Sequence, residues 1–219
     1  MVDLRLYALL DPERAGGHDL TALGRAVVAG GATLIQLRDK HGSTRRLIDE
    51  TRAIKAALGS SGVPVLVNDR VDVALAAGAD GVHVGQDDMP AAEARRLLGP
   101  SAVIGLSVKT IGEAETAPLD VLDYVCLGGV FATTSKDNTS APIGIAGLRN
   151  LLAALRARAP DFPIGAIAGI DETNAGEVVS AGADGVAVIS ALSLAPDPAG
   201  AARRLRGIVD QSLRARGTP

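Results

Sequence analysis

Short apolar runs recur along the chain, and segments with helical spacing of apolar residues lie between them. The runs are continuous and do not alternate with polar residues, which is typical of strands buried on both faces of a parallel sheet. We predict eight strands, at residues 4–10, 33–37, 63–67, 81–85, 102–106, 124–127, 164–168 and 185–189.

Two of the intervening segments carry clear helix signals. Residues 19–29 begin at the capping-type Asp19 and end at a Gly-Gly pair, and residues 44–58 end before Gly59. Eight strand and helix units of about 27 residues each predict an α/β fold, the (β/α)8 TIM barrel. A doubly wound open sheet is the alternative, but no early Gly-x-Gly-x-x-Gly turn favours it.

A five-residue pattern recurs where helices end and strands begin. Ala-Gly-Ala-Asp-Gly occupies residues 77–81 and 181–185, and a looser version occupies 29–33. Its glycines suit a left-handed helix exit and a tight entry to the strand. Asp80 and Asp184 are therefore expected to be turn residues at the structural end of the sheet, away from the chemistry.

Length and composition narrow the class of protein. A single barrel domain over residues 1–219 is expected, with residues 213–219 fraying as terminal segments commonly do. The chain is 47% apolar but only 2% aromatic, so its core has to be aliphatic. A net charge of −3 without a basic tract argues against nucleic acid as a partner.

No apolar stretch approaches the roughly 18 residues of a membrane span, so no membrane partner is expected. Cys126 is the lone cysteine, which excludes an internal disulfide and fits a reducing compartment. We therefore expect a cytoplasmic protein, in which Cys126 is a small buried hydrophobe. His83 is expected to be a hydrogen-bonded interior residue, and His18 and His41 are expected in loops.

The carboxyl ends of the strands carry the chemistry of a (β/α)8 barrel, so polar residues just after each run are the candidates. Gln36, Arg38 and Lys40 follow the second run, and as alternate residues of an extended segment they face the same way. An amide, a guanidinium and an ammonium can grip a polar heterocycle at one end and a diphosphate at the other. Ordinary loop charges are the alternative.

Acidic residues end the third and fourth runs. Asn68 and Asp69 follow one, and Gln86, Asp87 and Asp88 follow the next. Each acid could be a helix cap or a turn residue, but two successive strands that both present carboxylates favour a shared cation. Mg²⁺ typically takes one or two carboxylates and leaves its other positions to water and substrate phosphate.

The later strand ends offer contacts for phosphate. Ser107 could hydrogen-bond a phosphate or cap the helix that starts near residue 111, and no partner is apparent that would activate it as a nucleophile. The polar loop 128–142 is rich in hydroxyls. The exits at Gly169 and Ser190 could bind a phosphate through backbone N–H groups.

Several motifs stand in a set order along the chain: Gln36-Leu37-Arg38-Asp39-Lys40, Val67-Asn68-Asp69, His83-Val84-Gly85-Gln86-Asp87-Asp88, the Thr/Ser-Lys loop and Val188-Ile189-Ser190. In order and spacing they resemble the thiamine-phosphate synthase family, over nearly the whole chain. The resemblance implies a TIM-barrel transferase of thiamine biosynthesis that uses Mg²⁺. Such enzymes join 4-amino-2-methyl-5-pyrimidinylmethyl diphosphate to 4-methyl-5-(2-phosphoethyl)thiazole, releasing pyrophosphate and forming thiamine phosphate. By family analogy the chain is also expected to form a homo-oligomer.

The resemblance further implies roles for individual residues. It places the pyrimidine diphosphate on Gln36, Leu37, Arg38, Asp39, Lys40, Asn68, Ser107 and Lys136, of which Arg38, Ser107 and Lys136 are the catalytic candidates. It places the thiazole phosphate on Thr133, Thr134, Ser135, Gly169, Ile189 and Ser190, and Mg²⁺ on Asp69 and Asp88. No general base or covalent nucleophile is required if pyrophosphate leaves first, because the electron-rich aminopyrimidine can stabilise the carbocation.

Two positions depart from the family pattern. The family loop usually reads Pro-Thr-x-Thr-Lys, and here Ala132 stands in place of the proline. Strand seven usually exits through Gly-Gly-Ile, and here Ala168 replaces the first glycine. Both departures bear on the geometry of the thiazole phosphate site.

Two other functions remain open at this stage. A thiazole tautomerase shares the barrel and the phosphate end but needs neither pyrophosphate nor metal. A non-catalytic protein that binds phosphorylated ligands could use a degenerate barrel. The full set of acids and cations at the strand ends argues against both.

Overall fold

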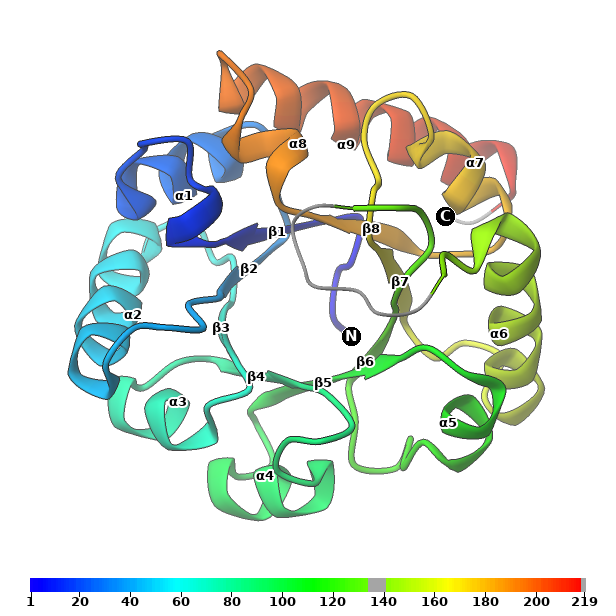
Figure 1. The fold of residues 1–219 in the computed structure, drawn as a ribbon, viewed down its shortest axis with the longest axis horizontal. Helices are drawn as coiled ribbons and strands as arrows, with labels where there is room; N and C mark the ends of the chain where they lie inside the picture. Colours follow the sequence, from blue (N-terminus) through cyan, green and yellow to red (C-terminus); the bar gives the residue numbers. More distant parts are fainter. Residues whose placement is uncertain (134–140, 218–219) are drawn as a thin grey trace.

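Eight parallel strands form a closed barrel in which each strand pairs with its neighbours in sequence and β8 pairs with β1 (Figure 1). The computed structural model describes residues 1–133 and 141–217. The strands are Leu6–Leu10 (β1), Leu34–Leu37 (β2), Val65–Asn68 (β3), Gly81–Val84 (β4), Val103–Val108 (β5), Tyr124–Leu127 (β6), Ile164–Ile167 (β7) and Gly185–Val188 (β8). The predicted (β/α)8 barrel is confirmed, and the open-sheet alternative is wrong.

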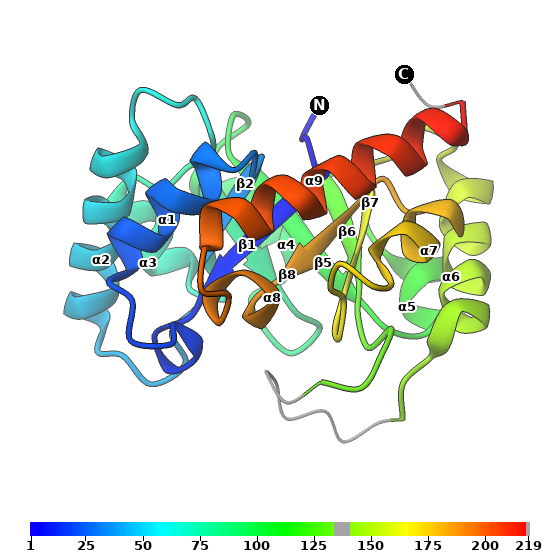
Figure 2. The same cartoon turned by 90° about the horizontal axis from the view of Figure 1, so that it is seen from above.

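Helices surround the barrel on its outer side (Figures 1 and 2). They are η1 (Pro12–Arg14), α1 (Leu20–Ala29), α2 (Thr44–Leu58), α3 (Val71–Ala77), α4 (Ala91–Leu98), α5 (Ile111–Thr116), α6 (Gly144–Arg158), α7 (Ala175–Ser180), α8 (Ser190–Ser193) and α9 (Pro198–Ala215). Asp19 caps α1 as expected, since its carboxylate accepts a hydrogen bond from the Ala22 N–H at 2.8 Å. No helix of the described residues is long and apolar enough to cross a membrane.

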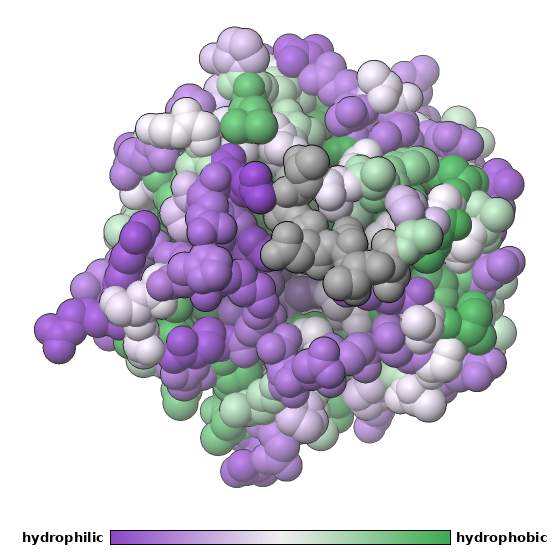
Figure 3. All heavy atoms as spheres, in the orientation of Figure 1, coloured by the Kyte–Doolittle hydropathy of each residue, from purple (hydrophilic) through white to green (hydrophobic). Residues whose placement is uncertain are grey.

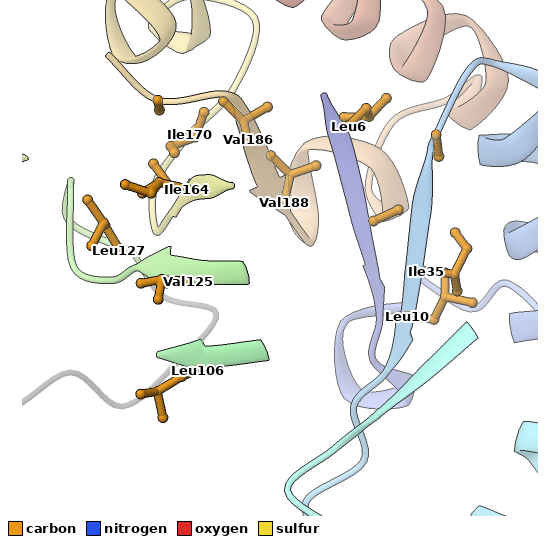
Figure 4. Close-up of a cluster of buried hydrophobic side chains, with 14 of the residues drawn as sticks. Leu6, Leu10, Ile35, Leu106, Val125, Leu127, Ile164, Ile170, Val186 and Val188 are labelled. Atoms are coloured by element: carbon orange, nitrogen blue, oxygen red, sulfur yellow. The ribbon is translucent and has the colours of Figure 1, made fainter. Parts of the chain in front are cut away.

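The core has two aliphatic layers, because successive strand residues face opposite sides of the barrel wall. The larger layer lies between the wall and the helices, and β1, β2 and β5–β8 all contribute to it (Figure 4). The smaller layer fills the barrel interior with residues such as Leu9, Leu34, Leu66 and Ile167. The interior also holds polar side chains, among them Gln36, which belong to the site described below.

Acidic residues brace the amino-terminal end of the barrel. Asp184 precedes β8, and its carboxylate accepts hydrogen bonds from the Ile164 N–H at 2.8 Å, from Arg156 at 2.6 Å and from Arg216 at 3.2 Å. The same arrangement of an acid, a strand N–H and a helix cation recurs twice, in Asp80 with Val65 and Lys55, and in Asp123 with Ile104 and Arg95. Asp80 and Asp184 therefore lie at the structural end of the sheet, as predicted.

The carboxyl-terminal segment differs from the expectation that residues 213–219 fray. Helix α9 runs to Ala215, and Leu213 is buried. The Arg216 guanidinium donates to the carbonyl oxygens of Val179 at 2.8 Å and Ala183 at 2.9 Å. Leu213 and Arg216 thus anchor the end of α9, and of this segment residues 218–219 lie outside the described part of the chain.

Candidate active site

The site lies at the carboxyl ends of the strands, the end opposite the amino terminus of the chain (Figure 2). Figure 3 looks onto this face, where hydrophilic side chains gather over the ends of β1 to β4. The part beside β7 and β8 is more mixed in polarity. The face therefore has two halves, a polar half over the first strands and a half of mixed polarity over the last.

Gln36 and Arg38 supply the buried polar groups of the first half. Gln36 is 1% exposed, and its side-chain N–H donates to the Tyr7 hydroxyl. Arg38 is 9% exposed and forms an ion pair with Asp11, which is 2% exposed. Gln36 Oε1 and Arg38 Nε are buried and have no hydrogen-bond partner among the described residues. Since buried polar atoms are almost always satisfied, these two are suited to a ligand.

Asp69 and Asp88 come from neighbouring strand ends and interact with each other. Burial raises the pKa of the Asp69 carboxyl, the hydrogen bond from Lys40 lowers it, and the adjacent Asp88 raises it again, for a net rise. Asp69 has a φ of 61°, and its N–H donates to the His83 carbonyl at 2.8 Å, while Asp88 accepts from the Gly85 N–H at 2.7 Å. Lys40 forms an ion pair with Asp69, yet the pKa of Asp69 is still raised, so a further cation between the two carboxylates would stabilise their charged forms.

The donor set of this pair fits Mg²⁺. Two carboxylates are the protein share of a typical Mg²⁺ site, and substrate phosphate and water complete the octahedron. No cluster of three or more His, Cys, Asp or Glu suited to a metal occurs in the part of the chain that the structure describes. A site that held its metal by protein ligands alone, as structural zinc sites do, is therefore not offered by these residues.

Ser107 lies inside β5 and does not cap a helix, so that alternative for it is wrong. Thr110 is the N-cap of α5, where its side-chain oxygen accepts from the Glu113 N–H at 3.2 Å. The Ser107 hydroxyl instead lies 2.8 Å from His83 Nε2. His83 is the hydrogen-bonded interior residue that the sequence predicted, since it is 6% exposed and its Nδ1 is 2.8 Å from the Tyr124 hydroxyl.

A hollow of about 600 Å³ lies over the ends of β7 and β8, next to the loop that leaves β6. It is lined by Ala132, Thr133, Ile167, Ala168, Gly169, Ile170, Asp171, Ala187, Val188, Ile189, Ser190, Ala191 and Leu194. Thr133, Gly169, Ile189 and Ser190, which the sequence assigns to one phosphate, are thus brought together around one hollow. The two departures from the family pattern, Ala132 and Ala168, line it as well.

The wall of this hollow is held by a close approach of two backbones. The N–H groups of Val130 and Phe131 donate to the carbonyls of Ile167 and Ala168, at 3.2 and 3.0 Å. At Gly169, φ is 64° and an added Cβ would lie 2.4 Å from the Ala132 carbonyl oxygen, so only glycine fits there.

Ala168 has a φ of 94°, a value that an L-residue with a Cβ adopts only under strain. This explains why a glycine suits the position.

The structure describes three other residues that the family resemblance assigns to the pyrimidine diphosphate. Leu37 is fully buried in the layer that faces the helices, so its side chain does not join the polar group. Asp39 accepts from the N–H groups of His41 at 3.0 Å and Gly42 at 2.7 Å, which orders the loop after β2. Asn68 ends β3, beside Asp69, as expected. The assignments to Thr134, Ser135 and Lys136 lie outside the described residues.

Sequence reasoning missed Asp11, Tyr7 and Tyr124. Asp11 directly follows β1, so the same strand-end rule that found Asp69 and Asp88 would have found it. The two tyrosines gave no such signal, because they sit within apolar strand segments. Their hydroxyls meet at 2.9 Å, although 117 positions separate them in the chain.

Fold and site together define a barrel enzyme that acts on phosphorylated small molecules. Residues 6–192 match the family model for thiamine monophosphate synthase, and the chain belongs to this family. The chain is similar to a thiamine-phosphate synthase of Agrobacterium fabrum, with 53% identity over 98% of each chain. It is also similar to one of Chloroflexus aurantiacus, with 49% identity over 95% of this chain and 94% of the other.

A solved structure agrees with these sequence matches. The thiamine phosphate pyrophosphorylase from Pyrococcus furiosus superposes with a TM-score of 0.83 at 36% identity, over 97% of this chain and 98% of that one.

Proposed function

We propose that this chain synthesises thiamine phosphate by joining a pyrimidinylmethyl diphosphate to a thiazole phosphate at the carboxyl end of its barrel. The observation that carries the proposal is the division of that end into two halves. One half holds paired carboxylates, cations and an amide oxygen that is buried without a partner among the described residues, and the other is a mostly apolar hollow whose lining includes Thr133, Gly169 and Ser190. A two-substrate coupling between a diphosphate and a phosphate needs both.

In this proposal the first half binds the pyrimidine diphosphate. Gln36 Oε1 accepts from the amino group of the pyrimidine, and Arg38 and Lys40 contact the diphosphate. Asp11 holds Arg38 through their buried ion pair, so that the guanidinium does not have to be ordered at the moment of binding. Asn68, Ser107 and Lys136 complete the group by family resemblance.

Asp69 and Asp88 would hold Mg²⁺ together with oxygens of the diphosphate. The bound cation would neutralise charge that develops on the leaving pyrophosphate. The protein's own part is to keep the two carboxylates adjacent, through the Asp69 N–H bond to His83 and the Gly85 N–H bond to Asp88. Arg38 adds a fixed positive charge at the same leaving group.

The second half binds the thiazole phosphate through Thr133, Gly169, Ile189 and Ser190, with Thr134 and Ser135 assigned by resemblance. Bond cleavage leaves its electron pair on pyrophosphate and an electron-deficient methylene on the pyrimidine. The thiazole nitrogen then supplies an electron pair to this carbon, so the overall reaction needs no general base. The site has to align the nitrogen and exclude water, which would otherwise capture the cation.

The test is to mix purified protein with both substrates, with Mg²⁺ or with a chelator, and to follow pyrophosphate and thiamine phosphate together. Equal and Mg²⁺-dependent formation of both is expected. Pyrophosphate without thiamine phosphate would locate the defect in the second half, at Ala132 or Ala168. Conversion of a thiazole tautomer without metal, and no coupling, would favour the tautomerase instead.

Cytoplasmic location and homo-oligomerisation stay predictions. The first rests on the lone, buried Cys126, which needs no oxidising compartment. The second rests on family analogy, and size-exclusion chromatography with light scattering would measure it directly.

A further inference from the structure

Five polar side chains form one continuous hydrogen-bonded chain inside the barrel. The Gln36 amide donates to the Tyr7 hydroxyl, which lies 2.9 Å from the Tyr124 hydroxyl. The Tyr124 hydroxyl lies 2.8 Å from His83 Nδ1, and His83 Nε2 lies 2.8 Å from Ser107 Oγ. These hydrogen bonds thus connect Gln36 and Ser107, two residues that the family resemblance assigns to the pyrimidine diphosphate.

The middle of the chain is packed tightly enough to hold its members in place. Tyr7 and Tyr124 meet edge to face with ring centres 5.8 Å apart, and His83 stacks on Tyr124 at 5.5 Å. The Tyr124 ring passes over Gly105, where an added Cβ would lie 2.1 Å from a ring carbon. Burial raises the pKa of both phenols well above their ordinary range, so each keeps one proton and has to donate it.

The orientation of the Gln36 side-chain amide determines which group is the donor in each of these hydrogen bonds, because each hydroxyl has one proton to donate. Tyr7 accepts from the Gln36 N–H, so its own proton goes to the Tyr124 oxygen. Tyr124 in turn donates to His83 Nδ1. A neutral imidazole that accepts at Nδ1 carries its proton on Nε2, and this N–H donates to Ser107.

The two ends then have defined and opposite characters. Gln36 presents its carbonyl oxygen to the site, where it is buried and without a partner among the described residues. Ser107 retains its hydroxyl proton and can donate it to an anionic oxygen. An amino group at one end and a phosphate oxygen at the other are the ligand chemistry that this polarity matches.

We infer that Tyr7, Tyr124 and His83 are positioning residues that set the substrate specificity of the reaction, by fixing the polarity with which Gln36 and Ser107 meet the pyrimidine diphosphate. The inference rests on the proposed function. It predicts that the protein discriminates a 4-aminopyrimidine from its 4-oxo analogue, because an oxo group would face the Gln36 carbonyl and leave both acceptors unpaired.

Reversing the direction of all these hydrogen bonds shows why Tyr7, Tyr124 and His83 are needed. In the reversed arrangement Ser107 donates to His83, His83 donates to Tyr124, Tyr124 donates to Tyr7, and Tyr7 donates to a flipped Gln36 amide. Gln36 would then offer N–H groups and Ser107 an acceptor, which suits the 4-oxo analogue and repels a phosphate. Loss of the Tyr124 hydroxyl frees Tyr7 to donate to Gln36, and so permits the flip without touching either end.

The test compares kcat/KM for the 4-amino and 4-oxo pyrimidinylmethyl diphosphates in wild type, Tyr124→Phe and Tyr7→Phe. The intrinsic reactivity of each substrate cancels in the ratio between proteins. Tyr124→Phe is expected to lower the amino-over-oxo preference by about tenfold or more. Thr51→Val is the control: it removes a fully buried hydroxyl in α2 that is not part of the hydrogen-bonded series, and it should leave the amino-over-oxo preference unchanged.

Equal loss on both substrates in Tyr124→Phe would mean a merely structural role and would overturn the inference. A wild type that turns over neither substrate would instead contradict the proposed function, which separates the two failures.

A measurement without substrate and without a tyrosine variant completes the test. Imidazole ¹⁵N chemical shifts of labelled wild-type protein distinguish the two neutral tautomers of His83, and His83→Gln identifies its signals. The Nε2–H tautomer is expected. The Nδ1–H tautomer, or an imidazolium at neutral pH, would reverse or break the chain and overturn the inference.

Discussion

The two ends of the barrel use the same residue type for opposite purposes. At the amino-terminal end, Asp80, Asp123 and Asp184 each have a strand N–H and a helix cation as partners. At the carboxyl end, Asp69 and Asp88 face each other. The acids of the first end each have their own strand N–H and helix cation, whereas Asp69 and Asp88 lie against each other and Lys40 pairs with Asp69.

Backbone strain follows the same division. The two non-glycine residues with positive φ in the described chain are Asp69 and Ala168, and both lie just after strand ends, at the carboxyl face. Three of the four unpartnered buried side-chain atoms of the described residues, on Gln36, Arg38 and Asp39, lie there too, and the fourth is on Glu50 in α2. Backbone strain persists only where the surrounding structure holds it, so Asp69 and Ala168 mark the functional end.

The largest expected effect comes from Asp88→Asn. The amide keeps an acceptor for the Gly85 N–H but removes the charge from the cation site, so coupling should fall by at least about 100-fold. The thermal midpoint should change little. Turnover at saturating Mg²⁺ and thermal denaturation measure the two quantities, and intact Mg²⁺-dependent turnover would remove Asp88 from the site.

The matching change at the other end is Asp184→Ala, which should do the reverse. It removes the acceptor of the Ile164 N–H and the partner of two arginines, with an expected loss of about 1–2 kcal/mol in the free energy of unfolding. kcat/KM at 25 °C should stay close to wild type. Asp184→Asn keeps an acceptor and should lose less, and a selective loss of activity in either variant would break the contrast between the ends.

Ala168→Gly should stabilise the protein by about 1 kcal/mol. The relief of strain at the positive φ is larger than the cost of the extra conformational entropy that glycine gives the unfolded chain. For a chain of this size, that corresponds to a rise of about 2–4 °C in the thermal midpoint. Ala166→Gly, within β7, is the matched control and should destabilise. A loss of stability in both variants would mean that Ala168 is not strained.

Asp69→Asn gives the smallest effect on the free energy of unfolding, and the size of this effect depends on pH. The raised pKa of Asp69 means that its protonated form favours folding, so stability is lost as pH rises above the ordinary value of 3.8. Without Mg²⁺, the variant should therefore be slightly more stable than wild type at neutral pH and equal to it in acid. Asp72→Asn is the opposite control, since the hydrogen bond from Arg70 lowers the pKa of Asp72.

Much of this division could be read from the sequence. The continuous apolar runs gave the barrel, and the strand-end rule then separated Asp69 and Asp88 from Asp80 and Asp184. The rule works because a barrel strand has only two ends, and the residues after it must lie at the carboxyl face. The same rule also identifies Asp11, which directly follows β1 and was missed.

The remaining features depend on contacts between distant parts of the chain. The Tyr7 and Tyr124 hydroxyls meet across the barrel interior, and Arg216 is held by carbonyls in the α7 region. No local pattern encodes either contact. At Ala168, the family pattern indicated a glycine, but only the backbone dihedral shows why.

The most direct test of the central claim is thermal denaturation of the wild-type protein with Mg²⁺ and pyrophosphate, added singly and together. If the carboxyl end is completed by a metal and a diphosphate, the pair should raise the midpoint by about 5–10 °C at 100 times the dissociation constant. Each alone should do much less, and Asp88→Asn should abolish the joint shift. A joint shift of the same size in Asp88→Asn, or none in wild type, would contradict the account.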